Sequence, residues 1–573
     1  MEAGKVVISG IFQNDRLLEI PFYQREYVWG EEQWAQFVSD MEYVTQTRKP
    51  YFLGSIILKR MSTPHIWEDD VAEEWTVIDG QQRLSTILIY FKALTLLTGK
   101  NDKFGDFMLG NGKAALLPGF ADAPEFDRII ERDKPERLES TGSGSKMVEA
   151  FNYFLDEIDT DQVSLMAIKG NVQMVCIEVA EGEDEQQIFD TINSRGVRLT
   201  TAELLKNYFF DRTTVKDYEK YWKAVFEQDA DARAYWGREI TTGRMTRTII
   251  DLFFGSFLQI KALQGSYGVS ADDRKRYERV DQIFNSYKHF VENYYGGADE
   301  RMGLVHELKP YADAFREAFD PEAVDRAVSR NPGTDRLGVI VFGLKSTTVI
   351  PYVLYVMRAV GEQTERDAIC DVLESYLMRR TVTRETTKNY NRLFGSLILN
   401  EVTTADGLRS FLAGQEDGTT RMPADDDIRR AFREETRYTN LYTKAILYML
   451  ESRVRPQNSS TALLGFSRYS LEHLMPKKWR NNWPSPGSKE AERERDETLY
   501  TLGNLAIITQ SLNSSIRDAE WATKKSGKGY RDGLEQCSGG LVTMDGVLAK
   551  EDWTEDDIRA RATELCELAL SIW

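Results

Sequence analysis

The stretch that decides the fold of the first part of the chain is residues 75–97, which read WTVIDGQQRLSTILIYFKALTLL. Its first four residues predict a buried strand, and Asp79 and Gly80 then make a tight turn. From Arg83 onward the apolar residues recur on one helical face, which predicts a helix to the end of the stretch. A helix that begins directly after a strand and a glycine turn leaves backbone N–H groups beside Arg83. This arrangement is typical of a phosphate or anion site, where Asp79 could hold a magnesium ion or a polarised water.

A simpler interpretation is that Asp79 caps the helix and Arg83 is solvated, and the turn alone leaves both interpretations open. Two further segments favour a functional one. Residues 21–29, PFYQREYVW, place polar side chains among aromatic ones, and residues 189–196, FDTINSRG, form a helix end and a polar loop. Because guanidinium groups bind phosphate oxygens and aromatic rings stack on bases, these segments predict a nucleotide site. No Walker-type phosphate loop occurs in the sequence, so such a site would use another fold.

The regions around these segments predict a mixed N-terminal part and a helical centre. Strands are predicted at 51–58 and 172–179, and a helix that starts with a capping box is predicted at about 202–210. The loop-rich segment at about 100–145 is expected to be a surface insertion. Residues 218–455 show long amphipathic stretches and few strand signals, so we expect them to be almost entirely helical.

Composition limits the class of protein. The chain has 573 residues, which corresponds to about three domains, and 42% of them are apolar, which excludes a globally disordered chain. The formal charge of −18 weakly opposes general coating of nucleic acid, although a local basic groove stays open. The 4 cysteines lie too far apart for a CxxC metal site, and no apolar run is long enough to cross a bilayer. We therefore expect a soluble, reduced, cytoplasmic protein.

The chemistry of the last part of the chain centres on one histidine. His473 follows Glu472 in the sequence LEHLMP, Asn504 precedes a predicted strand, LAIIT, and Asn513 precedes a helix predicted over 514–525. A lone histidine is more often structural than catalytic, and the chain has only 4 histidines, which disfavours a multi-histidine metal centre. A glutamate beside a histidine, however, offers a carboxylate for a divalent metal and an imidazole that activates water. A last helix is predicted at about 555–572.

Two groups of basic residues could contact DNA, and each is also open to the simpler interpretation of solvated or ion-paired charge. The first surrounds the histidine motif and consists of Lys477, Lys478, Arg480, Arg517, Lys524, Lys525, Lys528 and Arg531. The second lies in the helical centre, where Arg379 is followed by residues that step by four along one predicted helical face: Arg380, Arg384, Lys388 and Arg392.

Three N-terminal motifs together resemble a known family. PFYQREYVW, VIDGQQRLSTI and FDTINSRGVRLTTAELLKNYFF are similar, in order and spacing, to the N-terminal domain of GmrSD-type modification-dependent restriction enzymes, and SspE-type phosphorothioate-linked antiphage proteins are similar too. The resemblance covers about residues 5–210. It implies a ParB/sulfiredoxin-like fold that binds and hydrolyses a nucleoside triphosphate (GTP, UTP, CTP or ATP), with Asp79 and Arg83 in catalysis. The residues it implicates in nucleotide binding are Gln24, Arg25, Gly80, Gln81, Gln82, Arg83, Asn193, Ser194 and Arg195.

The C-terminal motifs resemble the ββα-metal HNH nuclease module found at the C-terminus of GmrSD-type proteins. The matching elements are EH-x-x-P and GNL. The resemblance implies that His473 is the general base, that Glu472 and Asn513 bind one Mg²⁺ or Mn²⁺, and that Asn504 steadies the loop carrying the histidine. Asn513 stands where the nominal pattern has a second histidine. The connection 477–501 is also longer than a minimal module needs.

These observations predict an α+β multidomain protein with a ParB/sulfiredoxin-like domain at 1–215, a helical domain at 216–455 and an HNH-type nuclease domain at 456–573. The expected function is that of an antiphage or restriction DNA endonuclease. We expect its N-terminal triphosphatase domain to regulate cleavage by sensing nucleotide, and DNA modification is a second candidate for what this domain senses. Its expected partners are DNA and a nucleoside triphosphate, with no membrane, and the oligomeric state is open. Two alternatives remain, a ParB-like DNA-binding clamp without nuclease activity and a triphosphate-dependent enzyme that modifies nucleic acid.

Overall fold

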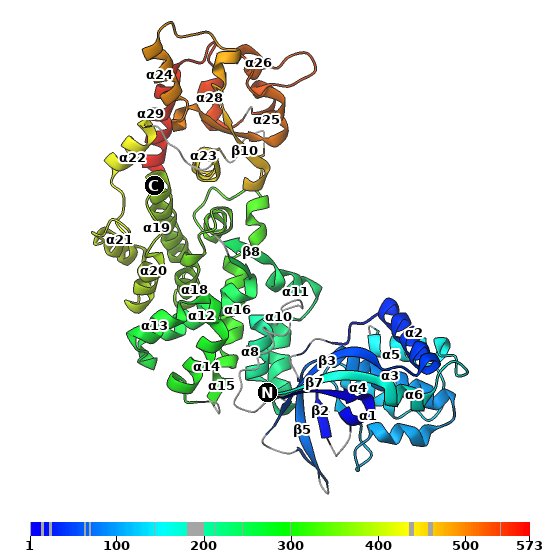
Figure 1. Cartoon of the computed structure of the whole chain (residues 1–573). Coiled ribbons are helices and arrows are strands. Elements are labelled where there is room, and N and C mark those ends of the chain that lie inside the picture. The colour runs from blue at the N-terminus through cyan, green and yellow to red at the C-terminus, as the bar shows by residue number, and fades with distance from the viewer. Residues whose placement is uncertain are drawn as a thin grey trace. The chain divides into compact units, whose positions relative to one another are not determined.

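The computed structural model describes residues 2–12, 16–21, 24, 26–61, 65–67, 70–141, 144–179, 200–210, 212–242, 245–297, 300–434, 440–456, 462–538 and 540–573. Its internal contacts divide the chain into two compact units, residues 1–219 and residues 220–573. In Figure 1 the first unit is coloured from blue to cyan-green and the second from green to red. Of the helices described, none is both long enough and apolar enough to cross a membrane.

The first unit is built on a mixed β-sheet whose strand order is β1-β7-β3-β5-β2-β6, with β4 paired to β5. Figure 1 labels β2, β3, β5 and β7 of this sheet. β7 is antiparallel to β1 and parallel to β3, and β5 is antiparallel to β3 and parallel to β2. The three strands predicted from apolar runs lie within β3, β5 and β7, so those predictions are confirmed. The bounds are β1 (Glu2–Val7), β2 (Arg16–Glu19), β3 (Tyr51–Arg60), β4 (His65–Trp67), β5 (Asp70–Asp79), β6 (Leu116–Leu117) and β7 (Val172–Val179).

The main apolar core of this unit lies between the sheet and its helices. α3 is central to it, because residues on every side of this helix, including Ile87, Leu88 and Phe91, are fully buried. At about 1.5–3 kcal/mol for each large apolar side chain removed from water, α3 is a main source of the stability of this unit. The helices are α1 (Ile8–Ile11), α2 (Glu31–Thr47), α3 (Gln81–Leu97), α4 (Ala123–Ile130), α5 (Lys146–Glu157), α6 (Leu165–Asn171), α8 (Thr201–Phe209) and α9 (Val215–Asp217).

The predicted capping box at the start of α8 is confirmed. The Thr200 backbone N–H donates to Glu203 Oε2 at 2.7 Å, and the Glu203 N–H donates to Thr200 Oγ1 at 3.2 Å. These bonds satisfy two backbone donors that a helix start leaves without an intrahelical partner.

The prediction of a surface insertion at 100–145 is wrong. β6 pairs with β2 and extends the sheet, and Phe107, Phe126 and Ile129 are fully buried in the main core. Within this segment Phe126, Ile129 and Ile130 have helical spacing and form the buried face of α4, but the polar turns on either side conceal this short signal in the sequence.

Where the structure describes it, the centre of the chain is helical, as predicted, apart from the antiparallel pair β8 (Glu239–Thr242) and β9 (Met245–Thr248). α12 carries several buried phenylalanines that pack against aromatic rings of the neighbouring helices. The helices are α10 (Ala224–Phe226), α11 (Ala230–Gly237), α12 (Ile249–Leu263), α13 (Ala271–Tyr277), α14 (Ile283–Tyr294), α15 (Arg301–His306), α16 (Leu308–Ala318), α17 (Thr334–Gly338), α18 (Ile350–Ala359), α19 (Gln363–Val382), α20 (Tyr390–Leu399), α21 (Ala405–Ala413), α22 (Asp425–Arg433) and α23 (Asn440–Val454).

The basic stripe predicted on one helical face does not exist, because α19 ends at Val382 and α20 begins at Tyr390. Between them Arg384 and Asn389 have positive φ angles of 58° and 77°. Arg380 is 1% exposed, and its guanidinium donates to the carbonyl groups of several turn residues, which draws the chain out of the helix. Arg379 and Arg392 pair with Asp425 and Asp417 at 2.8 and 3.4 Å, so these two residues and the carbonyl-bonded Arg380 are held by contacts within the protein.

A buried ion pair joins the helical centre to the end of α29 (Glu555–Ile572). Arg336 and Glu374 make two hydrogen bonds of 2.6 and 2.7 Å, and their side chains are 0% and 1% exposed. Trp573 Nε1 donates to the same carboxylate at 3.2 Å, and Arg379 Nε donates to the Trp573 carbonyl at 2.7 Å. The helical centre and the last helix are therefore parts of one folded unit.

The last part of the chain contains an antiparallel pair, β10 (Tyr469–His473) and β11 (Leu505–Thr509), followed by a helix. The predicted strand LAIIT and the predicted last helix have the bounds expected from the sequence, so both are confirmed. The remaining helices are α24 (Lys489–Thr498), α25 (Gln510–Ile516), α26 (Trp521–Ser526), α27 (Leu534–Cys537) and α28 (Val542–Leu548).

The single helix predicted over 514–525 is wrong, because α25 and α26 are separate. Arg517, with φ 40°, lies in the break. Asn482 Nδ2 donates to the Asp518 carbonyl at 2.8 Å, and Trp483 Nε1 donates to the Ala519 carbonyl at 2.9 Å. Side chains from a distant loop thus occupy carbonyls that would otherwise accept intrahelical bonds.

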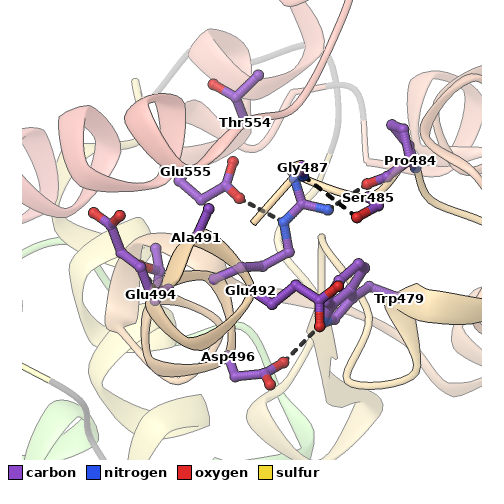
Figure 2. Close-up of polar contacts among 12 residues, drawn as sticks. Trp479, Pro484, Ser485, Gly487, Ala491, Glu492, Glu494, Asp496, Thr554 and Glu555 are labelled. Atoms are coloured by element: carbon purple, nitrogen blue, oxygen red, sulfur yellow. Dashed lines mark hydrogen bonds and ion pairs between the residues drawn. The ribbon is translucent and has the colours of Figure 1, made fainter. Parts of the chain in front are cut away.

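The long connection between β10 and β11 is ordered by a polar cluster around Arg495 of α24. Figure 2 labels Trp479, Asp496 and Glu555 of this cluster. The guanidinium donates to Glu555 at 2.5 Å and to the Pro484 carbonyl at 2.7 Å, and it lies 4.6 Å from the centre of the Trp479 ring. Trp479 Nε1 in turn donates to Asp496 at 2.8 Å. α24 therefore links the loop that follows β10 to α29, which accounts for the length of this connection.

Candidate functional site

The candidate site residues fall into two groups, one in each compact unit. Three of the candidates in the first unit, Asn193, Ser194 and Arg195, lie outside the described residues, and so does Arg25. All four candidates of the C-terminal motif are described.

His473 is the last residue of β10, where it pairs with Leu505 at the start of β11. Burial, followed by the nearby charges of Lys477 and Lys524, lowers the pKa of His473 to about 3. The imidazole is therefore neutral at pH 7, and a pKa this far below 7 also makes it a weak base. The Tyr500 ring lies edge-on to it at 6.2 Å between centres and limits its movement.

Asn504 is fully buried and ties down the segment that follows His473. Its Oδ1 accepts from the Met475 N–H at 2.8 Å, and its Nδ2 donates to the Met475 carbonyl at 2.8 Å and to the Leu499 carbonyl at 3.0 Å. Trp553 Nε1 also donates to Oδ1, at 3.2 Å. With its amide fully used inside the protein, Asn504 is placed to position the histidine loop rather than to touch substrate.

The glycine of the GNL motif allows α29 to approach Asn504 closely. A Cβ atom at Gly503 would lie 2.0 Å from the Ile558 carbonyl oxygen, so only glycine fits there. Arg561 of α29 donates to the carbonyls of Gly503 and Leu505 at 2.7 and 2.8 Å. Burial lowers the pKa of Arg561 to about 10, and these carbonyls partly replace its lost hydration.

Glu472 forms a buried ion pair with Lys524 of α26. The two residues are 7% and 0% exposed, and the ammonium group donates both to Glu472 Oε1 and, at 2.7 Å, to the main-chain carbonyl of His473. Burial raises the pKa of Glu472 and lowers that of Lys524, and their contact opposes both shifts. Lys524 therefore fixes both the Glu472 side chain and the main chain of His473.

Asn513 of α25 packs against β10. Its Nδ2 donates to Ser470 Oγ at 3.1 Å and to the Leu471 carbonyl at 2.9 Å, so its amide nitrogen is committed to the strand. The remaining polar atom of the side chain is the oxygen Oδ1. One carboxylate and one amide oxygen are hard ligands of the kind that Mg²⁺ and Mn²⁺ prefer, so Glu472 and Asn513 fit such an ion by their chemistry.

Two features of the site limit how it would hold a cation. The Lys524 ammonium already contacts one Glu472 oxygen, so a divalent ion would share this carboxylate. In the described part of the chain no group of three or more histidine, cysteine, aspartate or glutamate side chains is placed to hold a metal. The protein would thus supply few ligands, which is usual for Mg²⁺, and phosphate and water would supply the others.

The basic residues around this site divide into paired and exposed ones. Arg480 pairs with Asp496 at 2.8 Å, Lys525 pairs with Glu535 at 3.6 Å, and Lys524 pairs with Glu472. The other members of the predicted group are exposed and make no ion pair with any described residue: Lys477, Lys478, Arg517, Lys528 and Arg531.

In the first unit the turn between β5 and α3 is shaped by Gly80. Its φ of 99° is in the left-handed region, and a Cβ atom there would lie 2.6 Å from Ile56 Cγ2. The turn therefore requires glycine both for its backbone conformation and for the approach of β3. No side chain caps the start of α3, which leaves this helix end available to an anion.

Gln24 and Gln82 bring the first motif onto this turn. Gln24 Nε2 donates to the carbonyls of Val77 and Ile78 at 2.7 and 3.0 Å. Gln82 accepts from the Val28 N–H at 2.9 Å, so both glutamines hold backbone segments together. The two motifs therefore meet at this turn, and these two candidates have a scaffolding position.

Asp79 and Arg83 face each other at this turn, and Gln81 opens the first turn of α3. Arg83 Nη2 lies 3.4 Å from Asp79 Oδ2, and the two side chains are 23% and 26% exposed. The guanidinium packs over Gly54 of β3, and its buried Nε has no hydrogen-bond partner in the described structure. A buried donor without a partner beside an uncapped helix start is a feature that an anionic ligand would satisfy.

Sequence reasoning missed three residues that shape the C-terminal site. Lys524 was visible only as one basic residue among eight, and nothing in the sequence shows that it is buried against Glu472. Trp553 bonds to Asn504, 49 positions away, and Arg561 bonds to Gly503, 58 positions away, so no local spacing reveals them.

Comparison with known proteins places both sites within one family. The family model described as GmrSD restriction endonuclease, N-terminal domain, matches residues 8–210, which include β5, α3 and the glycine turn. The model described as GmrSD restriction endonucleases, C-terminal domain, matches residues 422–568, which include the histidine site. No curated protein matches the chain. The two models together span more than half of the sequence, and the chain therefore belongs to the GmrSD family of restriction endonucleases.

Proposed function

We propose that the chain is a metal-dependent DNA endonuclease whose active site is the unit formed by β10, β11 and α25, which is similar to an HNH module. The observation that carries this proposal is the position of a neutral imidazole, His473, at the end of a strand whose neighbouring residue Glu472 and packing partner Asn513 offer oxygen ligands. Membership of a restriction endonuclease family supports DNA as the substrate.

In the proposed reaction His473 accepts a proton from a water molecule as the water oxygen bonds to phosphorus. The phosphorus–oxygen bond on the opposite side breaks, and the leaving oxygen takes a proton from solvent. A Mg²⁺ or Mn²⁺ ion held by Glu472 and Asn513 would stabilise the negative charge on the phosphate. Asn504 holds the backbone after His473, so the imidazole keeps its orientation during the reaction.

Removal of divalent metal tests this proposal. Plasmid DNA incubated with the full chain is expected to be cut or nicked in Mg²⁺ or Mn²⁺ and to stay intact with a chelator, and cleavage should return when the metal is restored. Agarose gel electrophoresis separates the supercoiled, nicked and linear forms. An intact plasmid under all these conditions would instead support a DNA-binding clamp without nuclease activity.

For the first unit we propose a ParB/sulfiredoxin-like domain that binds and hydrolyses a nucleoside triphosphate. The uncapped start of α3 and the unpartnered Nε of Arg83 support a phosphate site there. Asp79 faces this guanidinium and is placed to orient a water or to hold Mg²⁺ on the phosphates.

Arg83→Ala is expected to lower phosphate release by about 10- to 100-fold, because a hydrogen bond to a charged group is worth about 1.5–3 kcal/mol. Its ion pair with Asp79 is partly exposed and adds little stability, so the fold should be retained. Arg137→Ala removes a comparable exposed ion pair, with Asp156, and serves as the matched control. If Arg83→Ala hydrolysed triphosphate at the wild-type rate, the phosphate site would have to lie elsewhere.

We further propose that triphosphate hydrolysis regulates cleavage, because one chain carries both sites. Cleavage rates are to be measured across a range of triphosphate concentrations, with matched phage DNAs that differ only in modification. A rate that changes with triphosphate supports regulation. A constant rate on modified and unmodified DNA alike would reject it and leave two independent activities.

A further inference from the structure

Residues 527–533 form a tight hairpin directly after α26. The Lys528 N–H donates to the Arg531 carbonyl at 3.0 Å, and the Arg531 N–H donates to the Lys528 carbonyl at 3.2 Å. Gly527 and Gly529 have φ angles of 81° and 64°, which other residues rarely adopt.

The base of this hairpin is closed by backbone packing. A Cβ atom at Gly527 would lie 2.1 Å from the Arg531 carbonyl oxygen, and one at Gly533 would lie 2.4 Å from the Gly527 nitrogen. The two arms therefore touch backbone to backbone. This packing fixes the shape of the hairpin and the direction of its tip.

The tip carries an aromatic ring between two cations. Tyr530 is 107% exposed, as open as in an extended peptide, and Lys528 and Arg531 are also exposed. Within the described structure no residue forms a side-chain hydrogen bond or ion pair with any of the three. Since the ring buries nothing in the folded chain, its presence at a rigid tip is not explained by folding.

The hairpin is connected to the proposed nuclease site through α26. Lys524 of this helix contacts Glu472 and the His473 carbonyl, and the hairpin begins three residues later. A surface pocket of about 530 Å³ lies between the hairpin and the turn that joins α25 to α26. Arg517, Lys528 and Arg531 line this pocket with Asp518, Glu520 and Asp532.

We propose that the hairpin 527–533 is a DNA-binding element in which Tyr530 stacks on an unstacked base while Lys528 and Arg531 bind the flanking phosphates. The proposal rests on the function proposed above, cleavage of DNA at His473. An aromatic ring between unpaired cations is the combination with which proteins hold single-stranded or opened nucleic acid. In a chain with a formal charge of −18, a hairpin with two unpaired cations favours a polyanion.

The test compares the full-length wild type with Tyr530→Ala, Tyr530→Phe and Tyr530→Trp. Fluorescence anisotropy with a partly single-stranded oligonucleotide should show binding weakened about 5- to 150-fold by alanine, the range expected for one base–aromatic stack, and retained by phenylalanine and tryptophan. With 2-aminopurine in the DNA, alanine should also remove the fluorescence quenching that stacking causes. Tyr43→Ala, at a 50% exposed tyrosine of α2, is the matched control.

A second pair of variants tests the cations. Lys528→Ala and Arg531→Ala should each reduce the slope of log Kd against log salt by about 1. Cleavage kinetics should show the loss mainly in KM for all of these variants, because none of the three side chains contacts His473. The melting temperature should not change with Tyr530→Ala, since that ring is exposed.

The possible outcomes distinguish failure of the hairpin proposal from failure of the nuclease proposal. If Tyr530→Ala binds DNA like the wild type while His473→Ala stops cleavage, the hairpin proposal is wrong and the nuclease proposal stands. If the wild type binds DNA but cuts none, the nuclease proposal is wrong, and the binding measurements still test whether the hairpin binds DNA. A wild type that neither binds nor cuts DNA overturns both, and binding of poly-glutamate that Tyr530→Ala weakens equally would assign the hairpin to an acidic protein partner instead.

Discussion

His473→Ala is expected to lower the single-turnover rate of DNA cleavage by about 10²- to 10⁴-fold, the range typical of a lost general base. Burial and two lysines lower the pKa of His473 to about 3, so the imidazole is uncharged at pH 7 and carries no proton that would block its role as a base. Asn504 lies behind it and keeps the following backbone in place with or without the imidazole. DNA binding, measured by anisotropy, should therefore stay within a few-fold of the wild type.

His306→Ala provides the matched control for this prediction. His306 ends α15 in the helical centre, where it is exposed and its ring lies 4.3 Å from the Tyr221 ring, tilted by 36°. Its replacement removes the same side chain from the same folded unit without touching β10. Equal rates for the two variants, or cleavage by His473→Ala at the wild-type rate, would remove His473 from its proposed role.

Glu374→Gln is expected to lower the free energy of unfolding by about 3–5 kcal/mol, the cost of leaving one member of a buried ion pair without its partner. Arg336 is 0% exposed and makes its two charged hydrogen bonds to this carboxylate alone, so its charge would stay buried and unbalanced. Arg453 and the Trp573 indole donate to different oxygens of this carboxylate, and glutamine keeps only one acceptor oxygen. Urea unfolding monitored by tryptophan fluorescence measures the loss.

Asp406→Asn is the matched control for Glu374→Gln. Asp406 is 94% exposed and pairs with Arg409 at 2.7 Å on the surface of α21. An exposed pair of this kind is worth about 0–1 kcal/mol, so this variant should unfold like the wild type. A wild-type unfolding midpoint for Glu374→Gln would show that the buried pair contributes no stability.

We expect the stability loss caused by Glu374→Gln to depend on pH. Burial acts to raise the pKa of Glu374, but the bonds from Arg336, with Arg453 nearby, outweigh it and hold the pKa below the usual 4.5. A carboxyl group whose pKa is lower in the folded state stabilises the fold above its usual pKa and loses this contribution as the pH falls through the folded value. The stability difference between the wild type and Glu374→Gln should therefore be full near pH 7 and shrink below pH 4.5.

The elements that the sequence predicted well are those with strong local patterns. Val172–Val179 and Leu505–Thr509 are short runs rich in β-branched residues, and Glu555–Ile572 combines amphipathic spacing with a capping box at Thr554. In each of these elements, the pattern that predicts the strand or helix lies in the residues that form it. The motifs around Gly80 and His473 could be placed on strand ends for the same reason.

The elements that were mispredicted depend on contacts between distant residues. The break after α25 forms because Asn482 and Trp483 bond to its carbonyls, and the turn after α19 forms around the buried Arg380. The ion pair of Lys524 with Glu472 joins residues 52 positions apart. A basic residue reads the same in the sequence whether it is exposed or buried, so periodicity alone could not separate Lys524 from its exposed neighbours.

The central claim is that His473 and Asn513 act in one active site, and a double-mutant cycle on the cleavage rate tests it most directly. Single-turnover rates are to be measured for the wild type, His473→Ala, Asn513→Ala and the double variant on the same plasmid in Mg²⁺. If the two side chains act as a unit, the double variant should lose little more than the more damaging single variant. A double variant that loses the product of the two single effects, or an Asn513→Ala variant that cleaves like the wild type, would contradict the claim.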